Sequence, residues 1–160
     1  MSLVGECLPG VKLQPVKRNA DDRGFLTEIL RADDRDFRQF GQAYITHCHF
    51  GAVKAWHEHA IQTDCFFCVQ GTMKVGLVDL RRGLAENSYM SWAYAILGEK
   101  GSDARLWIPP GVAHGFTPLS RDGATILNLP SHPYDRENPD ELRHQWDEFT
   151  GPEFWETENR

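Results

Sequence analysis

The sequence predicts an all-β protein with one domain, and three observations support this prediction. Short runs of β-branched and aromatic residues recur along the first 130 residues, with Gly, Pro, Asp and Asn between them. No long helical period separates these runs. The chain has 160 residues, a length that suits one compact core. Short strands at this spacing are typical of a barrel or jelly roll.

The predicted strands are short and are rich in residues that favour β-structure. In chain order they are Val11–Val16, Gly24–Leu30, Gln42–His49, Val53–His59, Asp64–Val69, Thr72–Leu80, Met90–Leu97, Ala104–Ile108, Ala113–Thr117 and Thr125–Leu129. A tight hairpin turn is expected at Gly71, because glycine readily adopts the positive φ angle that such turns need. The polar segment Arg31–Gln39 is expected to form a short helix or turn.

The amino-acid composition of the chain changes at about Pro130. Proline, charged and aromatic residues dominate positions 131–160, and the acidic run Asp135–Glu141 is expected to be a solvated loop. A tail of this composition usually packs over a core instead of forming its own. We therefore expect a barrel over about residues 11–130 and a short helical or irregular tail that covers it.

Charge and composition exclude several classes of function. The chain has 23 acidic and 17 basic side chains, a net charge of −6, which is the wrong sign for binding nucleic acid. No apolar run approaches the roughly 20 residues that cross a bilayer, and no secretory signal pattern begins the chain. We expect a cytoplasmic protein that contacts no membrane. Its four cysteines are expected to be reduced structural thiols, buried or half-buried: Cys7, Cys48, Cys65 and Cys68.

Histidine and carboxylate side chains cluster near the middle of the chain. His57 and His59 lie two residues apart on one predicted strand, so both side chains face the same side of the sheet. Asp64 begins the next strand, and a Pro-Gly turn precedes His114. Three imidazoles and one carboxylate can bind Fe(II), Mn(II), Ni(II) or Zn(II). The alternative is that these residues line a pocket that holds no ion.

The spacing of these residues resembles that of the cupin superfamily. Gly51, the sequence His-Glu-His at 57–59, Asp64 and Gly71 resemble the first cupin motif, with Asp64 in place of its glutamate. The sequence Pro-Pro-Gly-Val-Ala-His at 109–114 matches part of the second motif. The resemblance implies that residues 1–160 form a single cupin jelly-roll domain.

A narrower resemblance, from about Val11 to Glu141, is to the dTDP-4-dehydrorhamnose 3,5-epimerase family. Four features carry it: DRGFLTE at 22–28, VDLR at 78–81, IPPGVAHGF at 108–116, and Tyr134. The resemblance implies a metal-free homodimer without a cofactor that acts on nucleotide-linked 4-keto sugars.

The family resemblance also implies roles for individual residues. His57 takes the place of the catalytic base, which removes the proton α to the sugar ketone. Tyr134 matches the tyrosine that provides a proton on the opposite face. Substrate-binding positions of the family correspond to Arg23, Phe25, Glu28, Lys54, Gln62 and His114.

Asp64 departs from the family pattern. The family has a lysine at this position, which stabilises the enolate oxygen, whereas a carboxylate would repel the same negative charge. A metal ion or Lys54 could replace that lysine, but an imidazole that binds an ion cannot also accept a proton. If His57 binds an ion, it is therefore not the base.

Three functional hypotheses follow from the sequence. The first is an epimerase or isomerase of nucleotide-sugar metabolism. The second is a metal-dependent cupin enzyme, an oxygenase or isomerase, with His57, His59, Asp64 and His114 as ligands. The third is a cupin that binds sugar without catalysis.

Overall fold

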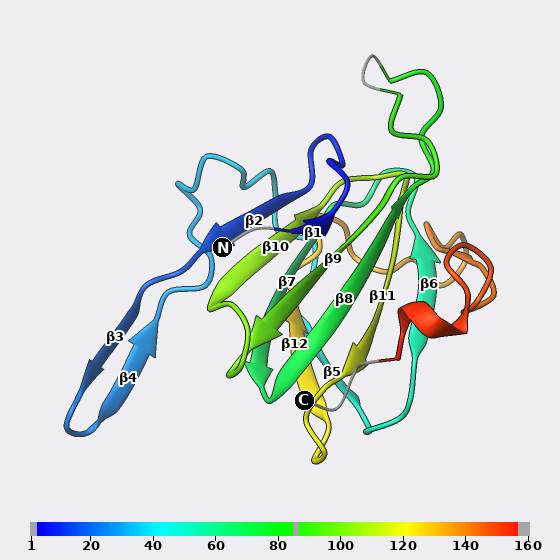
Figure 1. The fold of residues 1–160 in the computed structure, drawn as a ribbon. Helices are drawn as coiled ribbons and strands as arrows, with labels where there is room; N and C mark the ends of the chain where they lie inside the picture. Colours follow the sequence, from blue (N-terminus) through cyan, green and yellow to red (C-terminus); the bar gives the residue numbers. More distant parts are fainter. Residues whose placement is uncertain (1–2, 85–86, 157–160) are drawn as a thin grey trace.

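Two antiparallel β-sheets face each other and form a jelly-roll barrel (Figure 1). The fold is that of a computed structural model, which describes residues 3–84 and 87–156. The six-stranded sheet has the order β1 (Val4–Gly5), β9 (Trp92–Gly98), β8 (Thr72–Asp79), β11 (Val112–Pro118), β6 (Lys54–Glu58) and β13 (Leu142–Arg143). The five-stranded sheet has the order β2 (Lys12–Pro15), β10 (Ala104–Ile108), β7 (Asp64–Gln70), β12 (Ala124–Asn128) and β5 (Tyr44–Cys48).

A separate hairpin of two strands, β3 (Arg18–Asp21) and β4 (Gly24–Thr27), extends away from the barrel (Figure 1). Its strands are mostly exposed. The chain leaves the barrel after β2 and returns to it through a segment of turns, which leads to β5. The hairpin is therefore attached to the barrel only at its base.

The main hydrophobic core lies between the two sheets. Met73, Val75 and Leu77 of β8 point into it, and each is fully buried. Leu106 of β10 and Ile126 of β12 meet them from the five-stranded sheet and are also fully buried. Every residue of β8 is buried, including those that point away from this core. Because alternate residues of a strand face opposite sides, a second layer must cover the other face of β8.

Residues of the C-terminal tail provide that second layer. The Trp155 ring packs on Trp56 of β6, with ring centroids 4.7 Å apart. Gly76 makes this approach possible, because a Cβ atom there would lie 2.5 Å from the Phe154 ring. The tail contains one short 3₁₀ helix, Pro152–Phe154, and is otherwise irregular apart from the two residues of β13.

The predicted strands agree with the structure within a few residues at their ends. Ala104–Ile108 has the predicted bounds, and Gly71 has the predicted positive φ of 72°. Arg31–Gln39 forms turns. All four cysteines are free thiols, and Cys48, Cys65 and Cys68 are buried as predicted, whereas Cys7 is exposed because it lies in the N-terminal segment beside β1. No helix in the described ranges is long and apolar enough to cross a membrane.

Replacing Trp155 with alanine should lower the free energy of unfolding by about 3–5 kcal/mol, because the change opens a cavity above Trp56. Chemical denaturation measures this change. Phe50, whose side chain is 58% exposed, provides the control. Phe50→Ala should change stability by less than about 0.5 kcal/mol. Equal effects of the two substitutions would contradict the covering role of the tail.

Candidate active site

A cluster of buried polar side chains lies between the two sheets, at one end of the barrel. Its members are His59, Gln62, Asp64, His114 and Asn128, none of them more than 9% exposed. His114 belongs to β11 of the six-stranded sheet, whereas Asp64 begins β7 and Asn128 ends β12. Because β7 and β12 are antiparallel neighbours, the start of one lies beside the end of the other.

The Asp64 carboxylate is the centre of this cluster. Its Oδ2 atom lies 3.1 Å from Nε2 of His114 and 3.4 Å from Nε2 of His59. Its Oδ1 atom accepts hydrogen bonds from the amides of Gln62 (2.9 Å) and Asn128 (2.8 Å). Burial raises the pKa of Asp64, but the two imidazoles outweigh this effect and hold the pKa well below its usual range. Asp64 is therefore a buried negative charge.

The two imidazoles beside Asp64 are held in the same way. Nδ1 of His114 donates to the Val112 carbonyl (3.1 Å), and Nδ1 of His59 donates to the Asp140 carbonyl. Nε2 of each ring consequently faces Asp64. Burial lowers the pKa of His59, but hydrogen bonding to Asp64 and to the Asp140 carbonyl raises it to about 9. The space beside Asp64 therefore favours a positive charge.

His57 lies next to this cluster but outside it. It is directly opposite His114 in the β6–β11 pairing, and the two ring centroids are 6.2 Å apart. Its half-buried ring has a lowered pKa, chiefly because of burial and also because of His114, while Glu141 acts in the opposite direction. These effects favour a neutral imidazole, which is the form that accepts a proton.

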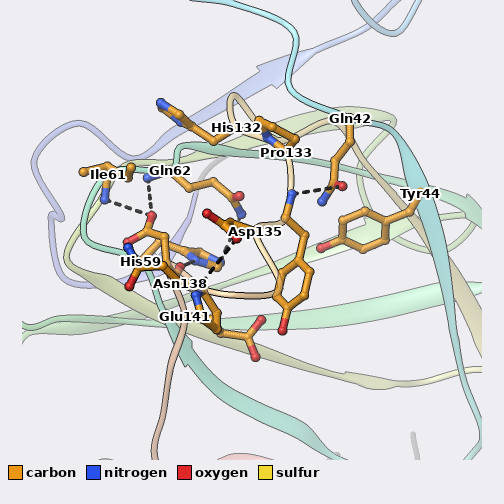
Figure 2. Close-up of a pocket in the computed structure, with 13 residues that line it drawn as sticks. Gln42, Tyr44, His59, Ile61, Gln62, His132, Pro133, Asp135, Asn138 and Glu141 are labelled. Atoms are coloured by element: carbon orange, nitrogen blue, oxygen red, sulfur yellow. Dashed lines mark hydrogen bonds between the residues drawn. The ribbon is translucent and has the colours of Figure 1, made fainter.

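A cavity of about 770 Å³ opens beside the cluster (Figure 2). Gln42 and Tyr44 lie on one side of it, and His59 and Gln62 lie on the other. Tyr134 also lines it. The volume is in the range of small-molecule sites. The residues that line the cavity are Gln42, Tyr44, His59, Ile61, Gln62, His132, Pro133, Tyr134, Asp135, Asn138, Pro139, Asp140 and Glu141.

The structure brings together some of the predicted site residues but not others. His59, Asp64 and His114 converge, with ligand atoms all within 4.8 Å of one another, and this group does not include His57. Gln62 and Tyr134 share the cavity. Lys54 lies three residues before His57 on β6 and donates to Thr46 Oγ1 (3.0 Å) and to the His47 carbonyl (2.7 Å).

The remaining predicted residues are near the hairpin and not at the cavity of the same chain. Arg23 lies at the turn between β3 and β4, with a side chain that is 84% exposed, and pairs with Asp21. Phe25 is 63% exposed, and Glu28 pairs with Arg31 just beyond β4. A single chain therefore does not bring these side chains to the cavity in Figure 2.

Two residues that support the site were not predicted. Asn128 connects Asp64 to the hydroxyl of Tyr44, which accepts a hydrogen bond of 2.9 Å. Asp140 lies in the acidic run expected to be solvated, yet its carboxylate accepts hydrogen bonds from the backbone of residues 60, 61 and 62 (2.8, 3.0 and 2.8 Å). Neither residue stands out in sequence, because each acts through contacts more than 60 positions away.

Comparison with known proteins gives consistent matches over most of the chain. The sequence model for dTDP-4-dehydrorhamnose 3,5-epimerase matches residues 6–151. The spore coat polysaccharide biosynthesis protein SpsL of Bacillus subtilis is 36% identical over 153 residues, which cover 96% of this chain and 99% of SpsL. A probable low-salt glycan biosynthesis epimerase of Haloferax volcanii is 31% identical, with 92% of this chain and 94% of the relative covered.

A solved structure agrees with these matches. NovW, a 4-keto-6-deoxy sugar epimerase from the novobiocin biosynthetic gene cluster of Streptomyces spheroides, superposes with a TM-score of 0.81 at 26% identity. The match covers 99% of this chain and 80% of NovW.

Replacing Asp140 with alanine should lower the free energy of unfolding by about 2 kcal/mol, because three backbone amides lose a charged acceptor. Hydrogen exchange of the amides at 60–62 should accelerate in the same variant. Asp122→Ala, at an exposed turn, is the matched control. Unchanged exchange at 60–62 in the Asp140 variant would show that the carboxylate does not hold this loop.

Proposed function

The chain belongs to the dTDP-4-dehydrorhamnose 3,5-epimerase family, and from this membership we propose that it epimerises a nucleotide-linked 4-keto sugar beside the ketone. Proteins of this family are sugar-nucleotide epimerases and isomerases, so an enzyme of this type is the starting point. The observation that carries the proposal is the half-buried imidazole of His57, whose pKa is lowered by burial. The family resemblance assigns the role of the base to this residue.

In the proposed reaction His57 removes the proton on a carbon α to the ketone. The electron pair of the broken C–H bond moves towards the ketone oxygen and gives an enolate. Tyr134 then gives its hydroxyl proton to the opposite face of the same carbon, which inverts the centre. Solvent takes the proton from His57 and restores the one on Tyr134. No electrons are gained or lost, so this reaction needs no redox cofactor.

Electrostatic contacts support the pairing of His57 with Tyr134. Glu141 lines the cavity together with Tyr134, and its charge acts on the pKa of His57. Arg143 lies opposite His57 in the β6–β13 pairing. Its pKa is raised mainly by Glu141 and also by Tyr134. The base and the proposed acid therefore share charged neighbours.

The substrate would bind in the cavity lined by Gln62 and Tyr134. His114, which is buried beside Asp64, and Lys54, an exposed residue of β6, are further proposed contacts. A nucleoside diphosphate carries negative charge, which Arg23 can bind through its planar guanidinium group. Arg23, Phe25 and Glu28 lie on or near the hairpin that extends from the barrel. We therefore place these three residues at the cavity of a second copy in a homodimer.

Deuterium from D2O should enter a dTDP-linked 4-keto-6-deoxy sugar at C3 or C5 when the enzyme is present. His57→Ala should lower this exchange by about 10²-fold or more, because the base is lost. Tyr134→Phe should retain part of the exchange, because His57 still removes the α proton and can return deuterium to the same face. The variant should lose the inverted product, because no hydroxyl group delivers a proton to the opposite face. Mass spectrometry and NMR of the sugar measure both quantities.

His47→Asn is the control for this experiment, because His47 lies on β5 and bonds to Thr125 outside the cavity. It should exchange at the wild-type rate. Wild-type protein that binds these sugars without any exchange would contradict the epimerase and favour a cupin that only binds sugar.

Light scattering should give a mass of about twice 18.3 kDa, as expected for a two-fold dimer. Mixing refolded chains that carry His57→Ala with chains that carry Arg23→Ala should restore exchange that neither variant has alone. One cavity of the mixed dimer then contains both His57 and the other chain's Arg23. A monomer, or no recovery on mixing, would contradict the exchanged hairpin.

A further inference from the structure

We propose that the hydroxyl group of Tyr44 donates a hydrogen bond to the ketone oxygen of the sugar and stabilises the enolate oxygen that develops there. The inference rests on the function proposed above and deepens it, because it identifies a group for the task that the family's lysine performs. Tyr44 lies outside the motifs that carry the family resemblance. It acts as a donor only and keeps its proton, so the proton balance of the reaction is unchanged.

Tyr44 lies where a bound sugar can reach it. It is the first residue of β5, and its ring projects from that strand into the cavity with the hydroxyl end foremost (Figure 2). His59 and Gln62 line the opposite side of the cavity. Tyr44 is 43% exposed. A sugar in the cavity can therefore contact its hydroxyl group without movement of β5.

The amide group of Asn128 determines which hydrogen bond the Tyr44 oxygen makes inside the protein. The side-chain oxygen of Asn128 accepts a hydrogen bond from the backbone nitrogen of Cys65 (3.2 Å). Its side-chain nitrogen donates to Oδ1 of Asp64 (2.8 Å) and to the Tyr44 oxygen (2.9 Å). A carboxylate only accepts hydrogen bonds, so the group that faces Asp64 must be the amide nitrogen. The Tyr44 oxygen is consequently the acceptor in its contact with Asn128.

The hydrogen atom of the Tyr44 hydroxyl is left for a ligand. Asn128 uses one lone pair of the oxygen, so the O–H bond points in another direction. Within residues 3–84 and 87–156, this hydroxyl group donates no hydrogen bond. The ketone oxygen of a sugar, or the enolate oxygen formed from it, is an acceptor of the kind that this O–H group lacks.

Electrostatic effects keep the Tyr44 phenol in its donor form. Burial raises the pKa of Tyr44, and the negative charge of Asp64 raises it further, whereas the hydrogen bond from Asn128 lowers it. The net effect is a raised pKa, so Tyr44 holds its proton at neutral pH. A phenol in this state stabilises an oxyanion by hydrogen bonding and does not release its proton.

The residue at the family's lysine position makes such a donor necessary. Asp64 stands there, and its negative charge opposes the charge that develops on the enolate oxygen. Lys54 donates to Thr46 and to the His47 carbonyl, and it does not line the cavity. Fixed tyrosine hydroxyl groups are among the donors that form oxyanion holes. Tyr44 therefore replaces the direct contact of the lysine with a neutral hydrogen bond.

Tyr44→Phe removes the hydroxyl group and keeps the ring. Deuterium exchange into a dTDP-linked 4-keto-6-deoxy sugar should fall about 10²-fold at saturating sugar, as for the loss of one oxyanion donor. Formation of the inverted product should fall by the same factor, because both processes pass through the enolate. Tyr134→Phe should differ, since it retains part of the exchange and loses the inverted product. The affinity for dTDP, which has no ketone, should not change in Tyr44→Phe.

Tyr89→Phe is the matched control, because the Tyr89 hydroxyl accepts a hydrogen bond from Arg82 (2.8 Å) outside the cavity. It should exchange at the wild-type rate. Exchange by Tyr44→Phe at the wild-type rate would overturn the inference and leave the epimerase standing. A loss of dTDP affinity as large as the loss of exchange would show that Tyr44 only shapes the cavity, and would also overturn it.

Infrared spectroscopy of the bound ketone tests the hydrogen bond without turnover. In chains that carry His57→Ala, a ¹³C label at C4 of the sugar identifies the carbonyl stretch. Its frequency should be lower with Tyr44 present than with Tyr44→Phe, because a hydrogen bond weakens the C=O bond. Replacement of Tyr44 by 3-fluorotyrosine, a stronger donor, should lower the frequency further and provides the test if Tyr44→Phe does not fold. The same frequency in all these proteins would overturn the inference.

The two measurements separate this inference from the proposed reaction. A carbonyl frequency that depends on Tyr44, without exchange on any 4-keto sugar nucleotide, supports the hydrogen bond to the ketone and overturns the epimerase. Exchange by the wild-type protein, with a carbonyl frequency that does not depend on Tyr44, supports the epimerase and overturns the role of Tyr44.

Discussion

The buried carboxylate of Asp64 is the constraint on which the site depends. A charged group that is 1% exposed is stable only if polar partners replace the water it has lost. Asp64 has four such partners: imidazoles of His59 and His114, and amides of Gln62 and Asn128. These partners come from both sheets and from the loop before β7, so one charge fixes the relative positions of the side chains at this end of the barrel.

This arrangement changes the chemistry expected at the family's lysine position. A lysine there would present a positive charge to the enolate directly, whereas Asp64 attracts a positive charge from elsewhere. A proton on the imidazole of His59 is one such charge. His57 lies outside this cluster, opposite His114 in the β6–β11 pairing, with ring centroids 6.2 Å apart. A positive charge on His114 would lower the pKa of His57 further and so favour its neutral form.

The sequence predicts the barrel well because its strands have strong local signals. Ala104–Ile108 is one example, and Gly71 is another, since a tight turn there needs its positive φ of 72°. Predictions failed at β3, a hairpin strand of exposed, mostly polar residues, and where pairing depends on distant residues. The strand β13 has only two residues and exists through its bonds to β6, while Asp140 is ordered by a loop about 80 positions earlier. Likewise, the spacing of the histidines predicts convergence at Asp64, but only the geometry shows that His57 lies apart.

The most direct test of this account is ¹⁵N NMR of the histidine side chains at about pH 7.5, because imidazole nitrogen shifts distinguish a neutral ring from a doubly protonated one. The account predicts a doubly protonated His59 ring, since Asp64 and the Asp140 carbonyl raise its pKa to about 9, and a neutral His57 ring, since burial lowers its pKa. A neutral His59 ring or a doubly protonated His57 ring at this pH would contradict it.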